Sequence, residues 1–344
     1  MEELLKKLIE TSSVSGCEEN LRDFLIKQIK PYVDETRVDK IGNVIFKKGS
    51  GRPKIMINAH MDEIGLMVKH IDEKGFIKFS PVGGVDKKIL PGQIVKIHGS
   101  KKIVSGVIGF KPIHVQKKEE MEKIPKIDEM FIDVAAKKDK DVASLGISVG
   151  DFVSFSPHIT KLFGSRVCGN GFDDRVGCLM MIEIVKKLKN FKGTLYAVGS
   201  VKEEIGLVGI RGAAFGINPD IAISLDVTIA GDDPYLKPGE SLPVLGKGPA
   251  LLIKDAVAIV QKNVRKWIES VAKENKINIQ YDIMDNGATD SSILPMIREG
   301  IPSAAVLIPS RYVHTPVEII DMSDVKEGVK LVSLLVKTAH KYFK

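Results

Sequence analysis

Hydrophobic side chains near the start of the chain follow first a helical and then a strand-like spacing. Apolar residues three and four positions apart predict an amphipathic helix that contains Leu4, Leu5, Leu8 and Ile9. A second helix is predicted to begin within residues 15–19. Two short strands, 37–39 and 43–46, flank a turn at Gly42, and a longer apolar run at 55–58 predicts a buried strand.

The pattern changes between about residues 67 and 162. Short β-like runs are separated there by turns that contain Gly, Pro or Lys, and these runs occupy 76–79, 94–97, 104–108, 130–134 and 152–155. Short strands at regular spacing with turn signals between them are typical of a small β-rich module. We therefore expect an inserted β-rich domain at 67–162.

From Arg166 onward, helical and strand-like patterns alternate. Helices are predicted at 173–189, 207–215, 257–274, 290–298 and 323–342, and strands at 195–201, 221–225, 279–283 and 304–308. Such alternation favours a mixed or parallel sheet covered by helices. The predicted fold class is α/β, with a discontinuous catalytic domain at 1–66 plus 163–344 interrupted by the β-rich domain.

Composition and charge exclude several classes of function. The 344-residue chain carries a net charge of +7, but its Lys and Glu residues are interspersed and aromatic residues make up only 6%, so we expect no nucleic-acid partner. No apolar run approaches the roughly 20 residues that span a bilayer, and the N-terminus lacks the layout of a signal peptide. Three cysteines without a CxxC pair favour a reducing compartment. We expect a cytoplasmic protein without membrane contact.

Potential ligands gather where the apolar runs end. The strand at 55–58 leads into His60, Asp62 and Glu63. The strand at 195–201 is followed by the adjacent acids Glu203 and Glu204, which repel each other unless a cation lies between them or one holds a proton. A third strand ends at Asp226, and His314 lies in a loop after the strand at 304–308.

Asp173 and Asp174 stand at the start of a strongly apolar helix and allow two interpretations. Two acids at a helix N-terminus can serve as a cap that interacts favourably with the helix dipole, which requires no metal. Alternatively, one of them belongs to the same site as the strand-end residues. The spacing alone does not decide which of the two acids would be the ligand.

Taken together, these segments predict a metal site. In an open α/β sheet the carboxyl ends of the strands converge on one crevice. Two histidines with three or four carboxylates match the demand of two divalent ions, zinc or cobalt, that share a bridging carboxylate. Such an ion pair activates water and polarises a carbonyl, and a further carboxylate can serve as the general base. The chain shows no phosphate-binding loop, no GxSxG elbow and no Cys/His nucleophile arrangement.

Five segments in order along the chain resemble the signature segments of the tetrahedral (TET) aminopeptidases, which are dinuclear metallo-aminopeptidases related to the leucyl and glutamyl aminopeptidases. They are AHMDEIG at 59–65, FDDRVG at 172–177, EEIGLVG at 203–209, LDVT at 225–228 and VHTPVE at 313–318. The resemblance covers essentially the whole chain, including an inserted β-rich domain. It implies one metal held by His60, Asp173 and Asp226 and a second held by Asp173, Glu204 and His314.

The same resemblance implies roles for three further residues. Glu203 is the base that activates water and later protonates the leaving amine. Asp62 orients the ring of His60 and raises its basicity. Asp290 belongs to a segment, NGATD at 286–290, that resembles the family's substrate-facing loop, and it is expected to act on the substrate. Asp173 is taken as the shared ligand because the family keeps the first acid of the Asp173-Asp174 pair.

The resemblance predicts an aminopeptidase that acts on short peptides. In such enzymes the inserted domain mediates dimerisation, and dimers assemble into a hollow dodecamer. Three alternatives stay open from the sequence: a related metal-dependent deacylase, an endoglucanase and a peptide-binding scaffold with a vestigial site. A glycosidase uses two carboxylates without a metal and has no need of His60 or His314, which disfavours the second alternative.

Overall fold

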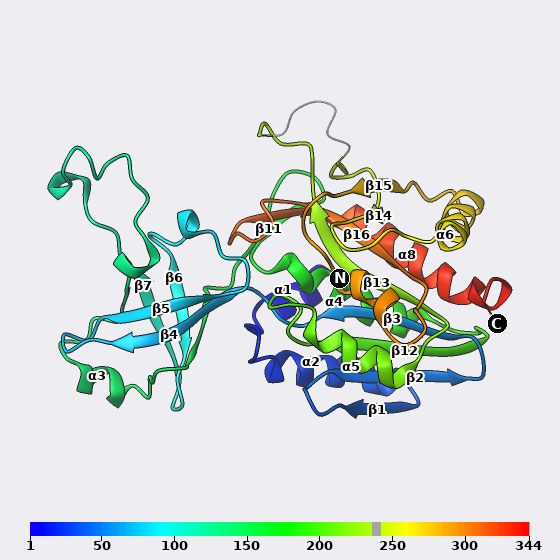
Figure 1. The fold of residues 1–344 in the computed structure, drawn as a ribbon, viewed down its shortest axis with the longest axis horizontal. Coiled ribbons are helices and arrows are strands. Elements are labelled where there is room, and N and C mark those ends of the chain that lie inside the picture. The colour runs from blue at the N-terminus through cyan, green and yellow to red at the C-terminus, as the bar shows by residue number, and fades with distance from the viewer. Residues whose placement is uncertain (236–241, 344) are drawn as a thin grey trace.

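The computed structural model describes residues 1–235 and 242–343, which form an α/β body and a smaller β-barrel beside it (Figure 1). In the described residues, eleven strands form the mixed sheet of the body and six form the closed barrel. The predicted fold class, an α/β sheet covered by helices with an inserted β-rich unit, is confirmed.

The chain enters the body through two helices and three strands. They are α1 (Glu2–Ile9), α2 (Glu19–Ile29), η1 (Lys30–Tyr32), β1 (Glu35–Val38), β2 (Val44–Ser50) and β3 (Lys54–His60). Both predicted helices are present, and each buries an apolar stripe in the core of the body, where both contact α4. The predicted strand at 55–58 is the middle of β3, in which every residue after Lys54 is buried.

The barrel is built from one continuous stretch of chain. Its elements are β4 (Gly65–Ile71), β5 (Ile77–Val82), η2 (Lys87–Ile89), β6 (Ile94–His98), β7 (Ile103–Ile108), η3 (Ile113–Val115), η4 (Ile127–Glu129), β8 (Ile132–Asp133), α3 (Asp139–Ser144) and β9 (Phe152–Phe155). The strands close in the order β4-β5-β8-β7-β6-β9 around an apolar core of their own. The predicted strand at 130–134 is wrong in length, because only its two residues Ile132 and Asp133 pair with neighbours.

After the barrel, the chain returns to complete the sheet. The elements are β10 (Ile159–Lys161), β11 (Arg166–Gly169), α4 (Phe172–Lys187), β12 (Gly193–Ser200), α5 (Val208–Ile217), β13 (Ile221–Ile229), β14 (Ala250–Lys254), α6 (Lys262–Glu274), β15 (Gln280–Ile283), α7 (Asp290–Ile293), η5 (Leu294–Met296), β16 (Ser303–Arg311), β17 (Glu318–Asp321), α8 (Met322–Thr338) and η6 (Ala339–Lys341).

Strand β3 lies at the centre of the sheet and determines where the site forms. The main order is β1-β2-β12-β3-β13-β16-β17-β11-β10, and β14 and β15 extend from β16. Strands β12 and β13 both run parallel to β3, and Ser200 pairs with His60. The carboxyl ends of these three strands therefore lie at one edge of the sheet, where ligand sites of open α/β sheets form.

Two predicted helices differ from the structure for identifiable reasons. The expected helix at 290–298 is only the single turn α7 followed by a 3-10 turn, with Pro295 near the start of that turn. The expected helix at 257–274 begins at Lys262, because the backbone N–H groups of Val257 and Ala258 bond the Asp255 carboxylate and hold a tight turn before it. No helix in the described part of the chain is long and apolar enough to cross a bilayer.

Candidate metal centre

Three neighbouring strands deliver acidic and imidazole side chains to the same edge of the sheet. His60 is the last residue of β3, Asp226 lies in the last half of β13, and Glu203 and Glu204 occupy the turn after β12. Because the strands are parallel and in register, their ends meet although the residues are far apart in sequence. His60 and the two glutamates thus lie at or just after strand ends, as predicted. The prediction that a strand ends at Asp226 is wrong, because β13 continues to Ile229 through its pairing with β16.

Asp173 joins the side chains into two adjoining groups. In the first, His60 Nε2 lies 2.9 Å from Asp173 Oδ1 and 3.8 Å from Asp226 Oδ1. In the second, His314 Nε2 lies 3.2 Å from Asp173 Oδ2 and 3.3 Å from Glu204 Oε2. Within each group the potential ligand atoms all lie within 4.8 Å of one another. Two candidate metal sites therefore share one carboxylate.

The backbone at the start of α4 separates the roles of its two acids. Asp173 and Asp174 have non-helical dihedral angles, with ψ values of 103° and 47°. The Asp173 carboxylate bonds both imidazoles, whereas the fully buried Asp174 accepts hydrogen bonds from the backbone of Gly177 at 2.7 Å and of His60 at 3.1 Å. Asp174 is therefore a structural acid beneath the site, and the helix-cap interpretation describes it better than it describes Asp173.

Asp62 fixes the backbone of the two glutamates. Its carboxylate accepts hydrogen bonds from the N–H groups of Glu203 at 2.9 Å and Glu204 at 3.1 Å and from the hydroxyl of Ser15 at 2.5 Å. The Nδ1 atom of His60 lies 3.1 Å from the Asp62 carbonyl oxygen and 3.5 Å from its carboxylate. Asp62 thus touches the His60 ring, as expected, but its carboxylate makes shorter contacts to the 203–204 turn.

The electrostatics of the site call for cations. Burial lowers the pKa of His314, but hydrogen bonds to Asp173 and Glu204 outweigh this effect and raise it to about 11. Burial also opposes the charged form of His60, yet nearby carboxylates, with Glu203 the largest contributor, raise its pKa well above the ordinary value. Positive charge among these carboxylates would offset their mutual repulsion.

Among the carboxylates on the cavity floor, Glu203 has the fewest contacts that stabilise its charged form. Burial raises its pKa well above the ordinary value of a glutamate, and Asp226 adds to the rise while His60 opposes it. In contrast, hydrogen bonds from His314 and His60 overcome the effect of burial on Asp173 and lower its pKa. A poorly compensated carboxyl next to the candidate ligands is in a suitable position to exchange protons.

Two contacts at the site were not predicted from the sequence. The buried Glu318 accepts hydrogen bonds from the backbone N–H groups of Phe172, Asp173 and His314, so it ties two potential ligands together. The carbonyl oxygen of Gly84, which belongs to the barrel, lies 3.1 Å from His314 Nδ1. Glu318 is visible in the VHTPVE segment, but only the fold shows what it bonds.

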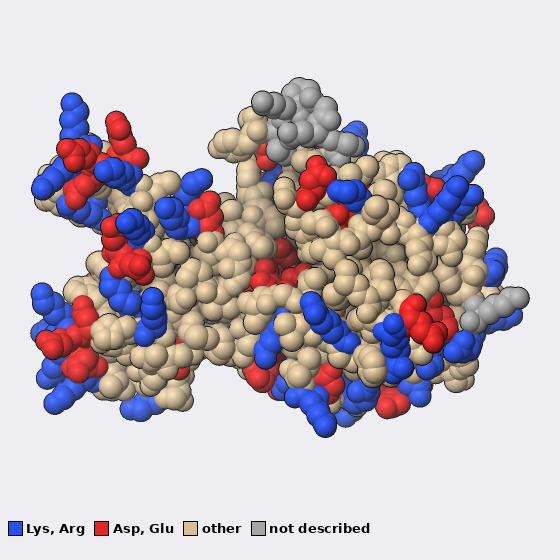
Figure 2. Space-filling view, viewed as in Figure 1, with Lys and Arg blue, Asp and Glu red and all other residues tan. Residues whose placement is uncertain are grey.

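A cavity of about 710 Å³ opens over the two groups. Its floor holds the ligand candidates and Glu203, and Figure 2 shows Asp and Glu side chains at the bottom of a hollow on this face. The remaining lining is contributed by Gly206, Leu207, Val227, Thr228, Ile229, Asp233, Tyr235, Met284, Asn286, Gly287, Ala288, Thr289, Tyr312 and Val313. The volume is sufficient for a small peptide terminus.

Asp290 lies beneath the cavity, and the segment before it forms part of the wall. It is 2% exposed, and its Oδ2 accepts hydrogen bonds from Asn58 Nδ2 at 3.0 Å and Ser200 Oγ at 2.6 Å. Burial raises its pKa to about 7. The structure thus connects Asp290 to β3 and β12, and residues 286–289 face the cavity.

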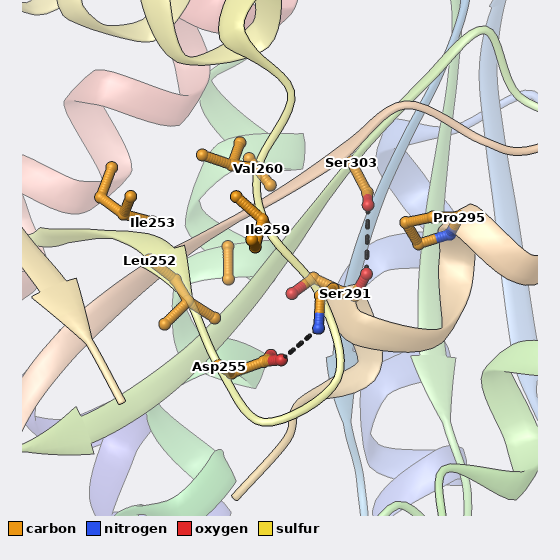
Figure 3. A pocket seen from close by; sticks show the side chains of 11 residues that line it. Leu252, Ile253, Asp255, Ile259, Val260, Ser291, Pro295 and Ser303 are labelled. Atoms are coloured by element: carbon orange, nitrogen blue, oxygen red, sulfur yellow. Dashed lines mark hydrogen bonds between the residues drawn. The ribbon is translucent and has the colours of Figure 1, made fainter. Parts of the chain in front are cut away.

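A second, much smaller cavity of about 20 Å³ lies behind the same loop (Figure 3). Its one carboxylate, Asp255, bonds two backbone N–H groups and the hydroxyl of Ser292. Ser303 donates a hydrogen bond to the carbonyl oxygen of Ser291 across it. These contacts hold the loop that carries Asp290 and leave no group of ligands facing this cavity among the described residues.

Comparison with known proteins identifies the family. The model of the M42 glutamyl aminopeptidases matches residues 42–331. The chain belongs to this family. Members of the M42 family are metallo-aminopeptidases, so the chain is a peptide-bond hydrolase, and the paired groups around Asp173 are its candidate metal sites.

Relatives resemble this M42 chain over nearly its full length. A putative aminopeptidase of Acetivibrio thermocellus is 42% identical over 96% of this chain and 97% of its own. The lysyl aminopeptidase of Pyrococcus furiosus is 37% identical over 97% and 96%. The fold matches aminopeptidase APDkam598 of Desulfurococcus kamchatkensis with a TM-score of 0.93, at 37% identity over 97% and 94% of the two chains. It also matches the TET1 peptidase of Pyrococcus horikoshii with a TM-score of 0.89, at 33% identity over 97% and 98%.

Proposed function

We propose that this M42 chain removes N-terminal residues from short peptides with two divalent metal ions and a glutamate base. The observation that carries the proposal is the pair of ligand groups that share Asp173, with Glu203 beside them on the cavity floor. One metal is assigned to His60, Asp173 and Asp226, and the other to Asp173, Glu204 and His314.

The residues present fit two divalent ions. Imidazole nitrogens and carboxylate oxygens are the donors that zinc and cobalt accept, and each group supplies three of them. The buried Oε1 atom of Glu204 has no hydrogen-bond partner, whereas its Oε2 faces His314. A buried carboxylate oxygen without a hydrogen-bond partner and two imidazoles with raised pKa values indicate that the site is suited to bind cations.

The chain's own residues then divide the work of peptide-bond hydrolysis. When bound, the metals supply Lewis acidity that polarises the scissile carbonyl and acidifies a water molecule. Glu203 takes the proton from the water whose oxygen attacks the carbonyl carbon. It returns this proton to the peptide nitrogen as the carbon–nitrogen bond breaks, so that a free amine leaves. Asp62 keeps Glu203 in place by bonding its backbone N–H.

Metal removal tests the proposed function. Hydrolysis of aminoacyl-p-nitroanilides should disappear after dialysis against EDTA and return with zinc or cobalt. Activity that survives complete loss of metal, checked by elemental analysis, would contradict the two-metal mechanism. N-acetylated amino acids, assayed in parallel, distinguish the deacylase alternative because an aminopeptidase requires a free N-terminal amine and leaves them intact.

We further propose the domain arrangement and the assembly. The α/β body, predicted at 1–66 plus 163–344, is the catalytic unit, and the barrel within the predicted insertion at 67–162 is the dimerisation domain; β10, at the end of that range, pairs with the sheet of the body. A dodecamer is seen for PhTET1-12s, and the Pyrococcus horikoshii TET1 peptidase can assemble into a tetrahedron. We infer the same dimer-based dodecamer for this chain, with access restricted to short peptides. The three free cysteines are in keeping with the reducing cytoplasm.

A further inference from the structure

The names of its relatives leave open which N-terminal side chain this M42 enzyme prefers. The family is described as glutamyl aminopeptidases, whereas the Pyrococcus furiosus relative is a lysyl aminopeptidase. These two substrates carry opposite charges at neutral pH, so one cavity cannot favour both. The charges around the cavity of this chain distinguish between them.

Asp282 is a buried acid that the proposed metal centre does not use. The residue is fully buried on β15, and its Oδ2 accepts a hydrogen bond from the hydroxyl of Thr228. Its other oxygen, Oδ1, is buried and has no hydrogen-bond partner. Among the ion pairs of the described residues, none includes Asp282. A buried carboxylate without a cation is unfavourable unless another group supplies the charge.

Asp282 lies close to the wall of the cavity in which the substrate is proposed to bind. Thr228 follows Asp226 by two residues on β13, so both side chains point to the same face of the sheet. Thr228 and Met284 line the cavity, and the Thr228 hydroxyl lies 3.8 Å from the sulfur of Met284. Asp282 therefore stands directly behind the part of the wall that adjoins the candidate metal ligand Asp226.

The cavity itself has an excess of negative charge. Its lining contains the carboxylates of Asp173, Glu203, Glu204, Asp226 and Asp233, and no Lys or Arg among the residues that the structure describes. Two divalent ions would balance the first four of these acids, which leaves Asp233 in the lining and Asp282 behind the Thr228 and Met284 part of the wall. An acidic substrate side chain would be repelled here, whereas a basic one would be attracted.

Two cations lie beside these acids in the fold and are already engaged: Lys254 pairs with the β15 residue that follows Asp282, and the partner of Arg311 precedes Asp233. Lys254 forms an ion pair with the exposed Asp285 at 2.9 Å, and Arg311 bonds Asp232 at 2.6 Å. Neither cation lines the cavity. The wall between the metal centre and Asp282 is largely apolar, with contributions from Ile229 and Met284, which suits the methylene stem of a lysine. Met284 has a flexible side chain that can yield to such a stem.

We propose that the cavity selects peptides with an N-terminal lysine or arginine and that Asp282, supported by Asp233, is the specificity-determining residue. The inference rests on the proposed aminopeptidase function. Asp282 does not itself line the cavity, so the side chain of Met284 moves aside when such a substrate binds. The substrate's ammonium or guanidinium group then donates a hydrogen bond to the free oxygen of Asp282, which completes the pairing of this carboxylate. A glutamyl side chain finds no cation in the same place.

Substrate panels on the metal-loaded enzyme test the proposal. The comparison of lysyl- with norleucyl-p-nitroanilide isolates the charge, because norleucine lacks the ammonium group and keeps the stem. We expect kcat/KM to be about ten- to a hundredfold higher for the lysyl substrate, the range of one charged hydrogen bond. Glutamyl- and leucyl-p-nitroanilide complete the panel, and wild-type enzyme alone is sufficient for this measurement.

Asp282→Asn should remove most of this preference, since it preserves the shape and the bond to Thr228. The matched control is Asp285→Asn, the same change on a nearby acid that is exposed and already paired with Lys254. A preference for leucyl or glutamyl substrates would overturn the inference and leave the aminopeptidase function standing. An equal loss on all substrates in Asp282→Asn would make this residue structural and also overturn it. Absence of hydrolysis of every aminoacyl substrate would overturn the proposed function itself.

Discussion

At the scale of single residues, the site is organised by carboxylates that bind backbone N–H groups. Asp62 holds the turn of Glu203 and Glu204, and Glu318 holds Asp173 and His314. Acceptors of this kind reduce the freedom of the loops that carry the potential ligands. The proposed ligands are therefore positioned before any metal arrives.

One substitution distinguishes the role of the proposed base from that of the proposed metal ligands. Glu203→Gln keeps the shape of the side chain but removes its ability to accept a proton, so turnover should fall by about 10²- to 10⁴-fold. Metal content, measured by elemental analysis, should remain at two ions per subunit. Glu183→Gln, which changes a glutamate paired with Lys187 on α4, is the control and should retain activity. Full turnover in Glu203→Gln would refute the assignment.

Glu318 provides a test of the backbone bonds. A glutamine at this position has one acceptor oxygen instead of two, so Glu318→Gln should release the backbone of either Asp173 or His314. We expect metal affinity to weaken by about 10- to 100-fold, as for other partners of metal ligands, in a chelator-competition titration. Glu327→Gln on the surface of α8 is the matched control. Wild-type affinity in Glu318→Gln would contradict this positioning role.

Candidate ligands could be predicted from the sequence where a charged or imidazole side chain interrupts an apolar run. His60, Glu203, Glu204 and Asp226 follow apolar runs abruptly, and the structure brings their side chains together at parallel strand ends. The roles of Glu318 and Asp282 could not be predicted, because each depends on a partner that is distant in sequence. A buried acid in a short strand looks the same in the sequence as an acid exposed on an edge.

At the scale of elements, the barrel and the body meet at the metal centre. The loop after β5 places Gly84 against His314, and a Cβ atom on Gly84 would stand 2.8 Å from His314 Nδ1. The inserted barrel thus helps to orient a residue of the catalytic body. The barrel is a separate unit in the sequence, yet it contributes a contact to the candidate metal centre.

Gly84→Ala tests this contact between elements. The added methyl group should push the imidazole away from Asp173 and Glu204, and metal affinity should fall by about tenfold or more. Gly109→Ala, also in the barrel, is the control because its Cβ would meet Phe131 only at 3.5 Å, an ordinary contact distance. If both variants bind metal as the wild type does, the barrel has no role in orienting His314.

The N-terminus of α8 gives a prediction about pH. The Asp321 carboxylate accepts hydrogen bonds from the Ser323 backbone at 2.9 Å and the Ser165 hydroxyl at 2.6 Å. Burial raises its pKa, but these hydrogen bonds outweigh burial and lower it below the ordinary value. The stabilisation is therefore complete above about pH 4 and is lost as the pH falls through the folded-state pKa.

Asp321→Ala should consequently reduce the free energy of unfolding by about 1 kcal/mol at neutral pH. The difference from the wild type should narrow toward about pH 3, because the wild type then loses its charged cap. Urea unfolding of the metal-free proteins at several pH values measures this. A difference that does not change with pH would show that the charge of Asp321 contributes nothing.

Element types were easier to predict than element lengths. Helices α4 and α8 and strands β12, β13 and β16 carry long apolar patterns, and all were predicted close to their observed positions. Strands β4, β10, β11, β14 and β17 were missed, and pairing with neighbouring strands defines each of them. Local propensity is weak where tertiary contacts decide the outcome.

At the scale of the whole molecule, the barrel exposes several large hydrophobic side chains among its charged ones (Figure 2). Large hydrophobic side chains on and near its strands are exposed, among them Ile94, Ile103, Val107, Ile113 and Val115. Ile94 and Val107 are paired across β6 and β7, and neighbouring exposed apolar side chains are typical of a binding interface. This surface supports the proposal that the barrel mediates dimerisation.

Ile103→Lys should weaken that dimer. Ile103 is 59% exposed in the single chain, and in a two-fold interface each substitution acts twice. Replacing two buried side chains by charges should raise the dissociation constant by more than about tenfold. Sedimentation or mass photometry should then show particles of lower mass than the wild type. Ile41→Lys, at an exposed isoleucine of the α/β body, is the control and should leave the mass unchanged.

The place of the barrel in the chain also has a consequence for protein synthesis. Strand β3 carries His60 but pairs with β12 and β13, which are translated about 130 residues or more later. The barrel strands are contiguous from Gly65 to Phe155, so they can close on the ribosome while β3 still lacks both neighbours. The nascent chain would therefore fold the barrel, with its proposed dimer interface, before the metal centre is complete. Contact between subunits would then begin before the enzyme is able to hydrolyse peptides.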